Sequence, residues 1–202
     1  RLNTNDSTIK TYVDNWYKNN LTAYTKYLSK DAVYCNDRNL ASGQTYSTTE
    51  GFNYASYERI YTNKQPTYNC TNVSDAFIVN NTSAKLDYPI GLMTIDELSY
   101  AGGESFTHLT TPYAWYYTNA NGESITGSAD SWSLSPSRWG GSYSGAWDVN
   151  GSGYHGLLSF GTVVNSLAVR PSVSLSSCNL ISRGDGSPEN PYVVYTGSGV
   201  CE

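Results

Sequence analysis

The chain has 202 residues, a formal net charge of −5 at pH 7 and a charged fraction of only 14%. This length suits one domain with a single hydrophobic core, and the acidic balance excludes the basic surface with which proteins bind nucleic acid. With 19 Tyr, 5 Trp and 18 Gly, polarity comes from hydroxyls and amides more than from ion pairs, which favours strands and loops. We therefore expect one α+β domain over residues 1–202, with no nucleic-acid partner.

The clearest helical pattern lies in the N-terminal segment 1–31. Apolar and aromatic residues recur there at helical spacing: Ile9, Tyr12, Val13, Trp16 and Tyr17. Either Asp6 or Ser7 is expected to cap the start of the helix. A second apolar set follows Asn20, so the segment is either two short helices or one helix with a weak joint. We interpret the apolar stripe as a core contact that packs this segment onto the domain.

Residues 32–80 are expected to be largely irregular, with short strands at 33–35 and 76–79 and a polar, tyrosine-rich loop at 43–61. Irregular stretches of this length are uncommon in compact domains unless something constrains them. A covalent cross-link within this part of the chain would supply the constraint.

Four widely spaced cysteines offer such cross-links: Cys35, Cys70, Cys178 and Cys201. They lack the close pairs that structural zinc sites use. Four cysteines allow three pairings, of which the sequential one, Cys35–Cys70 with Cys178–Cys201, closes two moderate loops. The alternative is four reduced thiols in a cytosolic protein. Because disulfides form in oxidising compartments, we expect two disulfides and an extracellular or cell-surface location.

A short helix is expected over residues 95–100. Thr94 caps its start, and Glu97 at the third helical position completes a capping box. The two glycines that follow Ala101 are expected to end the helix. A strand over residues 86–92 is expected to precede it.

The second half of the chain contains five short apolar or aromatic runs separated by Gly, Asn and Ser, at 113–117, 131–134, 146–149, 157–160 and 169–175. A glycine-rich turn at 184–186 then leads into a final strand. This spacing indicates short antiparallel or mixed strands joined by long loops. Trp132 and Val149, which lie in two of these runs, are expected in the core.

Between two framework-like segments, 132–137 and 169–175, the chain is crowded with Trp, Tyr, Ser, Gly and Asn. Large aromatic side chains on loops rich in glycine and serine suit a surface that binds more than a pocket that reacts. We predict that the interval 138–168 contacts a ligand through six residues: Arg138, Trp139, Tyr143, Trp147, Tyr154 and His155. Of these, Trp147 fits the protein core equally well.

The sequence offers little support for enzymatic chemistry. It contains two histidines, His108 and His155, neither in a nucleophile motif, and no phosphate-binding glycine loop. Two histidines do not supply a three-histidine iron site, and they lack the spacing of a zinc pair. We predict no catalytic residue, no metal and no cofactor. Calcium held by oxygens of Asp148 and Asn150 stays open, because hard cations take such ligands.

Two other functions also stay open. Pairs of carboxyl groups cleave glycosidic bonds, and the candidates for a carbohydrate-active enzyme are Asp96, Glu97, Glu104, Glu123, Asp130 and Asp148. Capping and the helix dipole explain the first two without catalysis, because both open a helix. The other possibility is a structural pilus-like or surface-layer subunit, which would assemble in order without a ligand.

Five segments carry a resemblance to a known domain: YPIGLMTIDE at 88–97, YAGG at 100–103, WSLSPS at 132–137, VRPSVSL at 169–175 and GDGSPENPYV at 184–193. They resemble a domain of surface proteins from gut Firmicutes and their relatives. DNWYK at 14–18 and YCNDR at 34–38 also resemble it, so the match covers nearly the whole chain. That domain is similar to the formylglycine-generating-enzyme branch of the C-type lectin-like fold, whose relatives include variable proteins diversified by retroelements. The resemblance implies this fold, with N-terminal helices and short antiparallel strands joined by long loops.

Carried over to this sequence, the resemblance assigns a scaffold role to Trp132, Pro136, Val169, Arg170 and Pro171, and a display role to the positions between them. It implies a non-enzymatic extracellular module, an adhesin or a diversified variable protein, that binds a protein or glycan at a cell or host surface. Such domains often follow a pilin-like or membrane helix, so we expect membrane contact only through an anchor outside this sequence. The chain lacks the cysteine and metal chemistry of the enzyme branch and the usual arrangement of lectin calcium tripeptides, so the resemblance implies neither activity.

Overall fold

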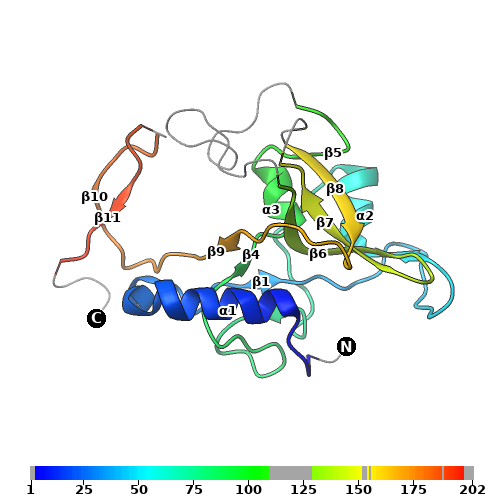
Figure 1. The fold of residues 1–202 in the computed structure, drawn as a ribbon, viewed down its shortest axis with the longest axis horizontal. Coiled ribbons are helices and arrows are strands. Elements are labelled where there is room, and N and C mark those ends of the chain that lie inside the picture. The colour runs from blue at the N-terminus through cyan, green and yellow to red at the C-terminus, as the bar shows by residue number, and fades with distance from the viewer. Residues whose placement is uncertain (1–2, 110–128, 152–153, 155, 188, 198–202) are drawn as a thin grey trace.

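A computed structural model describes residues 3–109, 129–151, 154, 156–187 and 189–197. The described residues form a mixed α+β structure in which one five-stranded sheet is accompanied by two-stranded sheets and a few helices (Figure 1). The predicted α+β class is confirmed. The strand expected at 113–117 lies outside the described residues. No helix among the described residues is apolar and long enough to cross a membrane.

The N-terminal segment is an α-helix followed by a 3-10 helix. Helix α1 spans Thr8–Asn20 and helix η1 spans Thr22–Tyr27. Of the two predicted caps, Asp6 and Ser7, the structure shows Ser7. Its side chain accepts a hydrogen bond from the Lys10 backbone N–H at 3.1 Å. The chain therefore continues in helical form beyond Asn20, but with a different hydrogen-bond pattern.

The apolar stripe of α1 is only partly a core contact. Val13 and Tyr17 are buried, whereas Tyr12 and Trp16 are 56% and 37% exposed. The burial prediction is wrong for the latter two, because the face of α1 that packs against the cluster around Trp132 carries Ile9, Val13 and Tyr17 (Figure 1).

The largest sheet has the strand order β2-β6-β7-β8-β5. Its strands are β2 (Phe52–Asn53), β6 (Ser131–Trp139), β7 (Ser144–Val149), β8 (Leu157–Thr162) and β5 (Glu104–Ser105). All neighbouring pairs are antiparallel except β5 and β8, which are parallel. The three long strands confirm the predicted runs and extend them, and β6 continues to Trp139 despite the proline within it.

The remaining strands are two or three residues long. They pair as β1 (Tyr34–Cys35) with β3 (Ala76–Phe77), β4 (Gly91–Leu92) with β9 (Pro171–Ser172), and β10 (Ile181–Arg183) with β11 (Val193–Val194). The strands expected at 86–92 and 169–175 are thus much shorter than predicted. The β10–β11 pair forms an arm that extends from the rest of the chain (Figure 1), and Gly184 and Gly186 in its turn have φ angles of 97° and 86°.

The segment 43–61 is not the uniform loop that its composition indicates. It contains β2 and helix α2 (Ala55–Tyr57), which runs into a π-helix, η2 (Glu58–Asn63). Ser56 and Ile60 are buried in this helical stretch, so tertiary contacts stabilise a helix that local sequence does not indicate. The predicted capping box of α3 (Ile95–Tyr100) is confirmed.

Two clusters of buried side chains lie on the two faces of strand β7. Trp147 and Val149 belong to the first cluster, which also contains Ile60, Ile95, Leu98 and Leu158. Ala146 packs against the second, which contains Trp132 and residues of α1. Successive residues of a strand point to opposite faces, so β7 separates the two clusters. Trp132 and Val149 are 6% and 1% exposed, which confirms their predicted core positions.

Cys35 and Cys70 form a disulfide with a Cα–Cα distance of 5.8 Å, as predicted. It constrains the irregular stretch 32–80, and it fits a protein that folds in an oxidising environment. Cys178 is also disulfide-bonded, while its predicted partner Cys201 lies outside the described residues.

Candidate ligand-binding surface

Trp147 is a core residue, which corrects its prediction as a ligand contact. Its side chain is fully buried, and its indole N–H donates a hydrogen bond to the Ser56 hydroxyl at 3.2 Å. The alternation along β7 turns this ring toward the cluster under α2, η2 and α3. A ligand on the surface of the folded protein therefore cannot touch it.

The other predicted contacts lie in different places. Trp139 is half-buried at the end of β6, and Tyr154 is 54% exposed with its ring centroid 5.2 Å from that of His108. His155 lies outside the described residues. Arg138 and Tyr143 lie together, because the Arg138 guanidinium is 5.5 Å from the centroid of the Tyr143 ring.

The Arg138 side chain lies among aromatic rings. Its guanidinium lies over Phe160 at 4.4 Å from the ring centroid, within the range of a cation–π contact. No described carboxylate forms an ion pair with it, and its buried Nε has no hydrogen-bond partner in the described part of the chain. The positive charge of Arg138 thus lies against aromatic rings, and its Nε donor forms no hydrogen bond with the described residues.

Two glycines make room for this arrangement. Gly145 pairs with Arg138 across β6 and β7, and a Cβ placed on it would lie 3.4 Å from the Arg138 Cγ and 2.8 Å from the Ser137 hydroxyl. A Cβ on Gly140 would lie only 2.4 Å from the Tyr143 ring. Gly140 and Gly145 are therefore needed here because they have no side chain. The space beside them is filled by the Tyr143 ring and by the side chains of Ser137 and Arg138.

The rings around Arg138 continue into a larger group, which we call the aromatic ridge: Tyr57, Tyr61, Phe106, Arg138, Tyr143 and Phe160. Phe160 lies 5.6 Å from Tyr57 and 5.2 Å from Phe106, measured between ring centroids. Tyr61 lies 5.1 Å from Tyr57 and 5.5 Å from Phe106. These separations suit tilted and edge-to-face aromatic contacts. The group rests on Trp147, which is in ring contact with Phe160 at 5.5 Å.

Three residues of the ridge are exposed to solvent. Tyr61, Phe106 and Tyr143 are 46%, 47% and 36% exposed, whereas Tyr57 and Phe160 are half-buried. Burial raises the pKa of Tyr57, with the neighbouring Tyr61 adding to the rise and the Arg138 charge opposing it. The ridge thus has a protected base and an exposed crest.

The backbone of Phe106 supports a surface role for its ring. Its φ angle is 52°, in the left-handed region that residues with a Cβ rarely adopt and that costs roughly 1 kcal/mol or more. The Phe106 ring is about half exposed, so burial of the ring does not compensate for this unfavourable backbone conformation. Such strain concentrates at binding and catalytic sites.

Four of the six ridge residues were not predicted from the sequence. Tyr57, Tyr61, Phe106 and Phe160 come from α2, η2, the residues after β5, and β8. The i, i+4 spacing of Tyr57 and Tyr61 is the one local signal, since it places both rings on one side of a helix. Nothing local in the sequence connects them with Arg138.

The carboxyl groups considered for an enzyme have separate structural roles. Asp96 accepts two hydrogen bonds from Arg59, each at 2.9 Å, and one from the Thr67 backbone N–H. Glu97 completes the capping box of α3. Both groups are therefore engaged within the protein.

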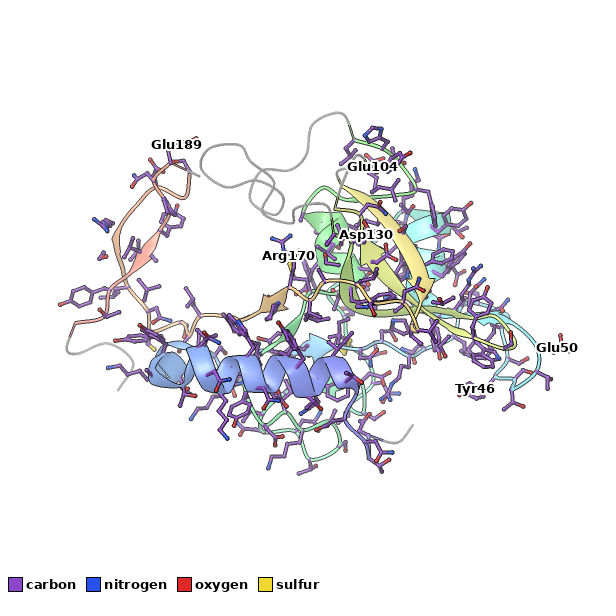
Figure 2. All side chains as sticks on the ribbon, in the orientation of Figure 1. Tyr46, Glu50, Glu104, Asp130, Arg170 and Glu189 are labelled. Carbon is purple, nitrogen blue, oxygen red and sulfur yellow. A yellow bond between two sulfur atoms is a disulfide. The ribbon has the colours of Figure 1, made fainter. Side chains whose placement is uncertain are left out.

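Among the other candidate carboxyl groups, Asp148 is buried and accepts a hydrogen bond from Ser159. Burial raises its pKa to about 6. Asp130 accepts a hydrogen bond from the Gly151 backbone N–H at 3.0 Å, and Glu104 is exposed on β5 (Figure 2). Glu123 lies outside the described residues.

A group of three carboxylates, Asp6, Asp14 and Asp87, lies at the start of α1. The Lys10 ammonium is within 3.5 Å of each, and its closest contact is with Asp14 at 2.5 Å. A cavity of about 280 Å³ adjoins this group. The lysine already neutralises the position that a cation would take.

Comparison of the chain with models of protein families, with curated proteins and with solved structures found no match.

Proposed function

We propose that this chain is a non-enzymatic module that binds a ligand through the aromatic ridge. The observation that carries the proposal is the Arg138 guanidinium, which lies over the Phe160 ring without a described carboxylate partner, beside rings that are up to about half exposed. Arginine and large aromatic side chains are enriched where proteins contact partners. An exposed aromatic group with a rigid base suits recognition because its side chains lose little freedom on binding.

The proposal includes a C-type lectin-like fold of the formylglycine-generating-enzyme branch, in which the interval 138–168 displays ligand contacts. The resemblance of the framework segments supports it. Further support comes from Arg138, Tyr143 and Phe160, three ridge residues that fall within this interval. We place the protein outside the cell or at its surface, since the Cys35–Cys70 disulfide fits an oxidising environment.

The test is a binding screen against arrayed glycans and surface proteins with a ridge variant, Tyr61→Ala with Phe106→Ala. The two rings lie on the exposed crest, so the variant is expected to lose binding at least tenfold while it keeps the fold. The matched control is Tyr12→Ala with Tyr24→Ala, which removes two other tyrosines that are 56% and 53% exposed. Equal binding by ridge variant, control and unaltered protein, or no binding by any of them, would reject the proposal.

A second function is favoured by the C-terminal arm, namely a subunit of an assembled surface structure. Described side chains from 176 to 197 include none that is buried, and Leu180, Ile181, Tyr192 and Tyr195 are each more than 40% exposed. An isolated two-stranded ribbon is marginally stable in water. Concentration-dependent assembly in light scattering, lost on replacement of Leu180 and Tyr192 by Ser, would favour this function.

A further inference from the structure

We infer that the ligand of the aromatic ridge is an acidic sugar, a monosaccharide unit with one carboxylate that Arg138 binds. The inference rests on the proposed function and names the ligand class of that same surface. It is argued from the charge of Arg138, the directions left open to its donors, the charges around the ridge, and the shape of the exposed rings.

Arg138 differs from the well-paired arginines of the chain. Arg38 forms an ion pair with Asp75 at 2.6 Å, and Arg59 forms ion pairs with Asp37 at 2.7 Å and Asp96 at 2.9 Å. The described part of the chain contains no such partner for Arg138, and its buried Nε lacks an acceptor. Its terminal Nη groups also form no hydrogen bond or ion pair with the described residues, so an anionic acceptor supplied by a ligand can bind them.

The geometry around Arg138 favours a planar anion. A guanidinium is planar, and its N–H groups point outward in its own plane. A carboxylate matches two parallel N–H donors of this kind. Phe160 and Tyr143 contact the guanidinium at 4.4 and 5.5 Å from their centroids, so they limit the orientations that the donors can adopt.

The charge around the ridge favours a single carboxylate over a polyanion. The elements that form the ridge also contribute Glu58, which is half-buried and accepts hydrogen bonds from Ser42, and Glu104, which is exposed. Their other arginine, Arg59, is already paired. The whole chain carries a net charge of −5. Polyanions such as nucleic acids need several unpaired cations along their length, and the described part of the ridge has one.

The shape of the ridge favours a sugar ring over an acidic peptide. The exposed rings of Tyr61 and Phe106 offer flat apolar faces with a phenol at one edge, which suits a pyranose with an apolar C–H face and peripheral hydroxyls. Peptides commonly bind by adding a strand to a sheet edge. Arg138 lies on β6 where that strand pairs on both sides, with Asn53 of β2 and Gly145 of β7.

The experiment compares matched sugars. Oligosaccharides that end in glucuronic, galacturonic or sialic acid are titrated into the protein by calorimetry, beside the same compounds with the carboxyl group reduced to the alcohol. We expect at least one acidic compound to bind about 10- to 100-fold more tightly than its reduced form, as for a charge-assisted bidentate contact. Arg138→Gln should remove that preference, and Arg138→Lys should retain part of it. Arg183→Gln, on the exposed arm, is the control and should change nothing.

The outcomes separate this inference from the proposed function. Equal binding of acidic and reduced sugars, lost in the Tyr61→Ala, Phe106→Ala variant, would overturn the acidic-sugar inference and leave the ridge as the binding surface. Binding of a glutamate-rich peptide through Arg138, without binding of any sugar, would show that the ligand is not a sugar. It would leave Arg138 as the residue that binds a carboxylate. Sugar binding that neither the Arg138 nor the ridge variants change would overturn both. Melting temperatures of each variant identify any loss that comes from misfolding.

Discussion

Arg59 and Arg138 lie in regions of the molecule that are built in opposite ways. Arg59 donates hydrogen bonds to two aspartates, and these partners raise its pKa further. Arg138 lies among aromatic rings and has a buried Nε without a described acceptor. The first arrangement uses the charge to join η2, α3 and the segment after β1 within the protein. The second leaves the charge without a described carboxylate partner, which is why we propose that a ligand binds there.

The comparison shows that burial alone does not separate a structural arginine from a binding one. Both side chains are partly buried. What differs is the partner: a carboxylate neutralises the charge and occupies the donors, whereas a ring neutralises nothing and occupies only the guanidinium face. The predictions below test this difference from the largest expected effect to the smallest.

Replacing Arg59 by Met should lower the free energy of unfolding by about 3–5 kcal/mol, because Asp96 and Asp37 would remain buried without their cation. Replacing Arg138 by Met should change it by less than about 1 kcal/mol, since no described ion pair is lost. Urea denaturation of both variants measures the difference. Equal losses would mean that Arg138 is as structural as Arg59.

Removing the Cys35–Cys70 disulfide should lower the stability of the protein, but the folded variant should keep the ridge, although Tyr57 and Tyr61 lie within the loop that the bond closes. The bond closes a loop with a sequence separation of 35, and replacing both cysteines by Ser should destabilise the protein by roughly 3–4 kcal/mol in the chain-entropy model. The double variant should still bind ligand at temperatures where it stays folded. Loss of binding in the folded variant would mean that the disulfide is needed to position Tyr57 and Tyr61 in the ridge.

Asp148 is expected to make the protein more stable in mild acid. Burial raises its pKa to about 6, above about 4 in an unfolded chain. The folded protein therefore binds a proton between pH 6 and 4 that the unfolded chain does not, so the contribution of Asp148 to stability increases as pH falls through this window.

Replacing Asp148 by Asn removes this titration. The variant should be more stable than the unaltered protein by about 2–3 kcal/mol at pH 7, and the advantage should disappear near pH 4. Thermal unfolding at several pH values measures it. Asp96→Asn provides the contrast, because Asp96 is paired with Arg59 and its replacement should destabilise the protein at pH 7. A pH-independent gain for Asp148→Asn would contradict the assigned cause.

Gly145→Ala is expected to change the stability by less than the replacements at Arg59, at the disulfide or at Asp148, and it is the most local test of the ridge. The added Cβ would press on Arg138 and Ser137, at a cost of about 1–2 kcal/mol, and should shift the guanidinium from the Phe160 ring. Ligand affinity should fall about tenfold or less, whereas Ser144→Ala, at the adjacent exposed position, should leave it unchanged. Unaltered affinity in Gly145→Ala would show that the position of Arg138 does not matter.

Local patterns predicted the parts of this molecule that depend on neighbours in sequence. The capping box of Thr94 and Glu97 defined the start of α3, because its hydrogen bonds join residues three apart. Ser7 capped α1 in the same way. The short strands β1 and β3 and the Cys35–Cys70 pair also lay where the sequence indicated.

The helical stretch α2–η2 could not be predicted in this way. Its sequence is polar and rich in tyrosine, but Ser56 meets Trp147 and the Pro136 carbonyl, residues that follow it by 80 positions or more. The burial of Trp147 had the same origin, since an aromatic residue in a glycine-rich run suits a core or a surface equally well. Contacts between distant segments determined both.

The amino-acid sequence by itself determined the fold class, the helix caps, the cysteine pair of the N-terminal half and the interval in which Arg138 and Tyr143 occur. Only the tertiary structure decided that Trp147, within that interval, is buried under the aromatic ridge. It also decided that Tyr57, Tyr61 and Phe106 join the ridge. The physical reason is the range of the interactions. Caps and turns depend on hydrogen bonds between near neighbours, whereas a binding surface depends on which faces of strands and helices meet when β6, β7 and β8 pair and α2 and η2 pack against them.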